Sequence, residues 1–96
     1  MPRHTNITIV AGVPAALSDG AVDACRVQNL SGYGFTLQAT ASGTPPGLYA
    51  GGVTLGAGET LAADLRLADL FPGVGSGALY LWGMSENPVT ASVSHA

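Results

Sequence analysis

Few side chains in this sequence could bind a metal ion or act as nucleophiles. The two histidines, His4 and His95, lie at opposite ends of the chain, and no HxH, HExxH or Cys/His cluster accompanies them. Two ligands rarely suffice to hold a metal ion. The single cysteine, Cys25, has only Arg26 as a close positive charge, and the alternation of a strand places Arg26 on the opposite face. We therefore expect neither metal nor cofactor, two solvated histidines, and a buried, unreactive cysteine.

Motifs for serine nucleophiles, nucleotides and paired carboxylates are also weak. The sequence contains no Gly-x-Ser-x-Gly, and its loose dinucleotide pattern at 73–78 precedes a predicted strand, whereas phosphate binding requires the start of a helix. Turn and capping hydrogen bonds explain Asp19, Asp23, Asp64 and Asp69 without catalysis. The sequence therefore predicts a protein that is not an enzyme.

The composition points to a protein that works against other protein surfaces. Only 9% of the 96 residues are charged, and the formal net charge is −3. An ordinary soluble domain carries about 25% charged residues, which keep its surface hydrated. Nucleic acids and anionic membranes are bound largely through Lys and Arg, so this acidic balance argues against both as partners. The apolar run near the start is too short for a signal peptide, and we expect assembly in a cytoplasm.

Short alternating runs separated by glycine and proline predict an all-β fold. The clearest alternation places Phe35, Leu37 and Ala39 on one face. Other strands are expected at 5–10, 21–30, 53–55, 60–65, 78–82 and 89–94. A tight connection is expected at 31–34, because its two glycines can adopt positive φ at little steric cost. A turn at 56–58 should make the strands at 53–55 and 60–65 neighbours, and residues 85–88 should join the last two strands.

One short helical turn should interrupt the strands. Leu67 to Phe71 have helical spacing, Asp64 is a candidate N-cap, and Pro72-Gly73 ends the element. We expect this turn to cover an open end of the fold. The predicted architecture is a single compact antiparallel β-sandwich or small barrel over residues 7–96, preceded by a flexible, polar arm of residues 1–6 that adds a strand to a partner's sheet.

Candidate partner contacts lie in the arm, in the loops and on one strand that is apolar on both faces. On that strand, either Tyr80 and Trp82 pack in the core while Leu79 and Leu81 face a partner subunit, or the reverse holds. A strand that is apolar on both faces must be covered on both sides, which favours an oligomer. The candidate contacts are Thr5, Tyr33, Leu48, Tyr49, Leu79 and Leu81.

Three stretches of the sequence, RVQNLSG at 26–32, LRLADLFPG at 65–73 and VSHA at 93–96, together resemble small β-sandwich head-decoration or cement proteins of tailed bacteriophages. The resemblance runs from about Val22 to the end of the chain. It implies a non-enzymatic virion protein that binds and stabilises the capsid shell, with the major capsid protein as its partner. It also implies a homo-oligomer, with a trimer favoured, on the capsid surface. No contact residue is carried over, because no contact motif matches.

A second interpretation is a receptor- or glycan-binding tip module of a phage tail or head fibre. That role predicts exposed aromatic side chains around Tyr33, Tyr49 and Trp82, because aromatic rings stack on sugars. The capsid role instead predicts a buried Trp82.

Overall fold

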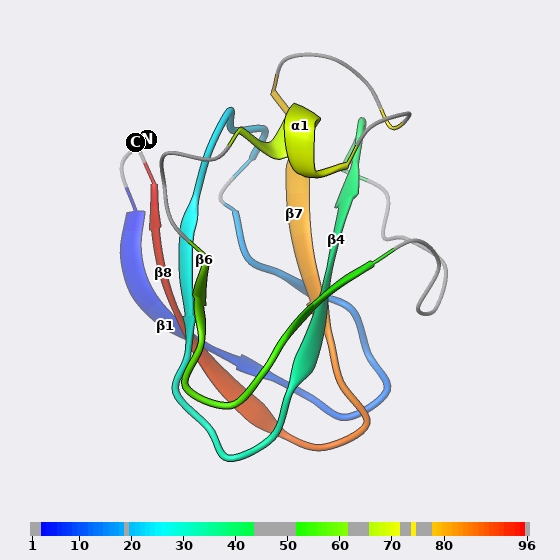
Figure 1. Cartoon of the computed structure of the whole chain (residues 1–96). Helices are drawn as coiled ribbons and strands as arrows, with labels where there is room; N and C mark the ends of the chain where they lie inside the picture. The colour runs from blue at the N-terminus through cyan, green and yellow to red at the C-terminus, as the bar shows by residue number, and fades with distance from the viewer. Residues whose placement is uncertain are drawn as a thin grey trace.

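Two four-stranded antiparallel sheets pack face to face around one apolar core in the computed structural model of this chain (Figure 1). The structure describes residues 3–18, 20–43, 52–61, 66–71, 74 and 78–95. The first sheet has the order β1-β8-β3-β6 and contains β1 (Arg3–Ile9), β8 (Val89–His95), β3 (Arg26–Asn29) and β6 (Thr60–Leu61). The second has the order β2-β7-β4-β5 and contains β2 (Ala15–Ala16), β7 (Tyr80–Met84), β4 (Phe35–Thr40) and β5 (Val53–Leu55). The expected all-β, antiparallel class is confirmed.

The core is formed by the alternating residues of the strands, as the sequence pattern predicts. On β8, Val89, Ala91 and Val93 are buried, while the residues between them are only half-buried. On β7, Gly83 also faces the core, since a Cβ atom at this position would lie 2.8 Å from Cδ1 of Ile9. The absence of a side chain at Gly83 therefore lets the two sheets approach closely.

Most connections between consecutive strands pass from one sheet to the other. Among the named strands, only β4 and β5 are neighbours both in sequence and in a sheet, and the other consecutive strands lie in different sheets. The connection at 31–34 therefore passes over the end of the core from one sheet to the other. Gly32 and Gly34 lack the positive φ that a two-residue hairpin requires, whereas Gly12, Gly20 and Gly58 have it. The predicted pairing of strands 53–55 and 60–65 is wrong for the same reason, because β5 pairs with β4 and β6 pairs with β3.

The N-terminal segment is a strand of the sandwich and not a free arm. β1 pairs with β8 along its whole length, from Arg3 opposite His95 to Ile9 opposite Val89. The prediction of a flexible arm over residues 1–6 is therefore wrong for residues 3–6, and residues 1 and 2 lie outside the described part. An edge strand can expose polar side chains and still form a full row of backbone hydrogen bonds with its one neighbour, which explains why a polar segment is ordered here.

The predicted helical turn is confirmed at one end of the sandwich. Helix α1 (Leu67–Leu70) lies above the ends of β7 and β4 in Figure 1, and its Leu67 is fully buried. The N–H of Leu67 donates to the carbonyl of Asp23 at 2.8 Å. The N-cap is Arg66, without a side-chain cap, so the predicted cap at Asp64 is wrong, and Asp64 itself lies outside the described residues. In the described part of the chain, no helix has the length and apolar character to cross a membrane.

Candidate functional site

The connections at one end of the sandwich form the most distinctive surface of the protein, and we call it the loop end. It lies opposite α1, at the bottom of Figure 1. It contains the connections β1–β2, β3–β4, β5–β6 and β7–β8, at residues 10–14, 30–34, 56–59 and 85–88. The end that carries α1 is called the helix end.

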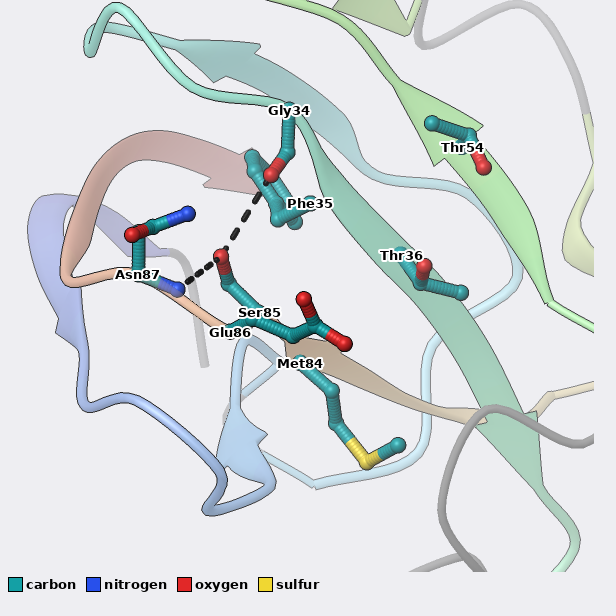
Figure 2. A pocket seen from close by; sticks show the side chains of 8 residues that line it. All are labelled: Gly34, Phe35, Thr36, Thr54, Met84, Ser85, Glu86 and Asn87. Carbon is teal, nitrogen blue, oxygen red and sulfur yellow. Dashed lines mark hydrogen bonds between the residues drawn. The ribbon is translucent and has the colours of Figure 1, made fainter.

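A pocket of about 320 Å³ opens at the loop end, beside the outer face of the second sheet. Its lining residues are Gly34, Phe35, Thr36, Thr54, Met84, Ser85, Glu86 and Asn87 (Figure 2). Three of them form a row across adjacent strands, because Thr36 on β4 lies opposite both Thr54 on β5 and Met84 on β7. Adjacent strands are about 4.8 Å apart, so Thr54 and Thr36 lie side by side on the floor of the pocket, next to the fully buried Met84.

The turn between β7 and β8 supplies the rim of the pocket. The Ser85 hydroxyl donates to the carbonyl of Gly34 at 3.4 Å and accepts the N–H of Asn87 at 3.1 Å, which ties this turn to the beginning of β4. Figure 2 shows the side chain of Glu86 extending from the turn toward β4. Glu86 is exposed and is the charged residue of the lining.

A buried asparagine holds the neighbouring loops in place. Asn29 is completely buried at the end of β3. Its Nδ2 lies 2.6 Å from the carbonyl of Tyr33, 3.2 Å from that of Leu55 and 3.1 Å from that of Gly56. Its Oδ1 accepts from the N–H and the hydroxyl of Ser31, at 3.0 and 2.8 Å. One side chain thus orders both the β3–β4 connection and the end of β5, and these two segments carry Gly34 and Thr54 to the pocket.

The loop end also exposes large apolar side chains. Val10, Val13, Leu30 and Tyr33 are 58%, 53%, 49% and 56% exposed. Hydrogen bonds fix the loops that carry them, since the N–H of Gly12 donates to the carbonyl of Ser85 at 2.8 Å and that of Leu30 to the carbonyl of Thr90 at 2.9 Å. Four such side chains on two loops at the same end of the sandwich favour an interaction site there.

Charge is distributed unequally between the two ends. The loop end carries Glu59 and Glu86, and no arginine or histidine lies there among the described residues. The arginines lie toward the helix end: Arg3 and Arg26 pair with residues near the C-terminal end of β8, and Arg66 precedes α1. The loop end is therefore apolar and weakly acidic.

The two leucines predicted to contact a partner, Leu79 and Leu81, are 1% and 0% exposed and belong to the core. This prediction is wrong. Leu81 lies on β7 and Leu79 lies just before it, opposite Val22, and alternation places both on the same side as Gly83, which packs against Ile9 of the first sheet. The opposite face is also covered within the single chain, since Trp82 is 8% exposed and Met84 is fully buried. The strand that is apolar on both faces therefore needs no second subunit to cover it.

The other predicted contacts have different positions. Thr5 is exposed on β1, opposite Val93 and away from the loop end, whereas Tyr33 is exposed at the loop end itself. Leu48 and Tyr49 lie outside the described residues. Of the four candidates that the structure describes, it brings only Tyr33 close to the pocket.

The residues considered for metal binding and nucleophilic chemistry also have clear positions. Cys25 is completely buried, as expected. His95 is 9% exposed within β8, so the expectation of a solvated histidine is wrong at this position. No group of three or more His, Cys, Asp or Glu side chains suited to a metal ion occurs within the described ranges.

Sequence reasoning missed the pocket, although some of its residues carried a signal. Glu86 is one of two glutamates in the chain, and its neighbours in the sequence are typical of a turn. The row from Thr54 through Thr36 to Met84 could not be recognised, because it depends on which strands pair and in which register.

The chain matches no protein-family model, and neither a curated protein nor a solved structure was found to be similar to it. Its function is therefore inferred from its own residues.

Proposed function

We propose that this chain is a non-enzymatic structural protein of a virion that binds and stabilises the capsid shell, with the major capsid protein as its partner. The observation that carries the proposal is the loop end, where Val10, Val13, Leu30 and Tyr33 are about half exposed or more, on loops that hydrogen bonds hold in place. The low charge of the chain and the resemblance of its three stretches to decoration proteins support the same role.

The physical basis of this role is multivalent binding. A contact of four apolar side chains is weak by itself, but it is repeated at every equivalent position of a capsid lattice. When the chain also associates with copies of itself, each further contact forms at a high effective concentration and the total binding becomes strong. A rigid sandwich suits this task, since little conformational entropy is lost when its loop end docks.

The test is the copy number of this chain in purified particles, measured against the major capsid subunit by quantitative mass spectrometry. A copy number comparable to that of the capsid subunit is expected for a protein that binds the whole shell. A number that matches only a few vertices or tail positions, or absence from the particles, would contradict the proposal.

We further propose that the chain acts as a homotrimer on the capsid surface, after assembly in the host cytoplasm. The buried β7 removes one argument for an oligomer, so the trimer is supported by the low charge and by the resemblance. Light scattering over a range of concentrations measures the state in solution, and image reconstruction of decorated particles measures it on the shell. A monomer in both settings would overturn the trimer.

The alternative role, a receptor- or glycan-binding tip, is favoured by the exposed ring of Tyr33 next to a polar pocket. The burial of Trp82 counts against it, because the largest aromatic side chain is then unable to stack on a sugar. A glycan array distinguishes the roles: specific binding that Tyr33→Ala abolishes would support the alternative, and the absence of binding would support the capsid role.

A further inference from the structure

We infer that the loop-end pocket receives a lysine or arginine side chain from the protein surface on which this end docks. The identity of that surface as the capsid subunit rests on the proposed function, whereas the preference of the pocket for a cation on an aliphatic stem does not.

The size and lining of the pocket suit one long side chain. Its volume of about 320 Å³ is at the lower end of the roughly 300–1,000 Å³ that is usual for small-molecule sites. Thr54 and Thr36 offer their methyl groups to an aliphatic stem, whereas the neighbouring Met84 is fully buried. Lys and Arg side chains lay such stems on apolar surface while the charged group stays at a polar rim.

The charge of the rim selects a cation. Glu86 is exposed at the pocket and forms no ion pair with any residue in the described part of the chain. Glu59, the other glutamate at the loop end, is occupied, because its Oε1 accepts the N–H of Gly56 at 2.6 Å. The arginines lie toward the opposite end of the sandwich, so an anionic group would meet only negative charge here.

A sugar is a poorer fit to the same pocket. Sugar sites use an exposed aromatic face, but the aromatic residue of this lining, Phe35, is 2% exposed. The exposed ring of Tyr33 belongs to the neighbouring loop and does not line the pocket. The observations therefore favour a protein partner over a glycan.

The apolar side chains around the loop end give the ion pair its strength. An exposed pair contributes little, because water and salt screen it. When Val10, Val13, Leu30 and Tyr33 dock on a partner, they exclude water from the region that contains Glu86, and the same pair becomes stronger. The pocket thus supplies specificity, and the surrounding apolar contacts supply burial.

The first experiment uses small probes and does not depend on any capsid. The ¹⁵N-labelled chain is titrated with n-butylammonium and n-propylguanidinium, which mimic the two side chains, and with n-butanol as the neutral probe. We expect the cations to shift the amide signals of Thr36, Thr54, Glu86 and Asn87 with millimolar affinity, and Glu86→Gln to weaken this binding at least fivefold. The matched control is Asp23→Asn, which removes one exposed carboxylate at the helix end and should leave binding unchanged.

The outcomes decide between the explanations. The inference would be overturned if n-butanol bound as tightly as the two cations. It would also be overturned if the cations bound the Glu86→Gln variant as tightly as the wild type. Shifts of the pocket signals by a glycan, unchanged by Glu86→Gln, would overturn it in favour of a sugar site.

The second experiment measures binding of the fluorescently labelled chain to purified, undecorated capsid shells. We expect Glu86→Gln to weaken binding about tenfold, Glu86→Lys to weaken it further, and Asp23→Asn to leave it unchanged. If the cationic probes bind the pocket but the wild-type chain does not bind shells, the proposed function fails and the pocket's preference stands. If shells bind wild type and Glu86→Gln equally, the inference fails and the proposed function stands.

Discussion

Replacing Asn29 by alanine tests whether one buried side chain organises the loop end. The Asn29→Ala variant removes an amide that contacts the carbonyls of Tyr33, Leu55 and Gly56 and accepts two hydrogen bonds from Ser31. Alanine is smaller and remains compatible with a strand, so the main effect is the loss of these polar contacts. We expect a folded but clearly less stable protein.

The magnitude follows from the number of bonds that the amide can make. Nδ2 carries two protons, so three carbonyl oxygens share two donated bonds, and Oδ1 accepts two more. At about 1 kcal/mol net for each bond, the total is about 4 kcal/mol. Water can reach some of the released groups, since only the contact with Leu55 is fully buried. The expected loss is therefore about 2–4 kcal/mol, out of roughly 5–14 kcal/mol for a domain of 96 residues.

The assay is urea unfolding followed by the fluorescence of Trp82, the single tryptophan of the chain. Trp82 is buried and its Nε1 donates to the hydroxyl of Thr40 at 2.9 Å, so unfolding changes its surroundings strongly. The midpoint should fall while the m-value stays constant. The matched control is Asn6→Ala, an exposed asparagine on β1, which should change stability by less than about 0.5 kcal/mol. A loss below about 1 kcal/mol for Asn29→Ala would refute the reasoning.

The Asn29→Asp variant adds a test by pH. It places a carboxyl where three carbonyl oxygens face Nδ2, and both burial and these oxygens disfavour the charged form. The pKa of the introduced carboxyl is therefore raised in the folded state above its unfolded value of about 3.9. The loss of stability relative to the wild type should be small below pH 4 and should grow as the pH rises between the unfolded-state and folded-state pKa values. It should reach its full size above the folded-state pKa. A penalty that does not change between pH 4 and pH 7 would contradict this account.

Three further variants or reactions test the rest of the fold. Leu81→Ala should lower the free energy of unfolding by about 2–5 kcal/mol, because it leaves a cavity in the core. Leu30→Ala on the exposed loop should lower it by less than about 0.5 kcal/mol. Equal losses in urea unfolding would contradict the assignment of Leu81 to the core and Leu30 to the surface. Gly52→Ala should be strongly destabilising, because the added Cβ would clash with the side chain of Thr36 and would lie 3.0 Å from the carbonyl oxygen of Leu37. A melting temperature equal to that of the wild type would refute this close approach. Cys25 should react with a thiol reagent only on unfolding, so rapid labelling of the native protein would show that it is accessible.

Local patterns in the sequence were sufficient to predict the fold class and much of the core. Phe35 and Leu37 alternate with polar residues, and a side-chain period of two places them on one face wherever the strand lies. Leu67 and Phe71 have helical spacing, and the helical turn forms because it covers the end of the core. These features depend on neighbours only a few residues away, and they can therefore be recognised from the chain alone.

The order of the strands, by contrast, depends on contacts between distant segments. Arg3 and His4 give no local sign of order, and they extend the strand expected at 5–10 because β8 continues opposite them. The sequence is equally ambiguous about which face of β7 points into the core, since both of its faces are apolar. Packing of Gly83 against Ile9 decides that Leu79 and Leu81 face inward.

The sequence by itself thus determined that the chain is an antiparallel β-protein of low charge, because alternation and composition are local properties. Only the tertiary structure decided that consecutive strands alternate between two sheets, since tight turns and crossing connections have similar compositions. It also decided the candidate site: Thr54, Thr36 and Met84 form one row solely through the register of β5, β4 and β7. A pocket assembled from three strands and a turn has no counterpart in any single stretch of sequence.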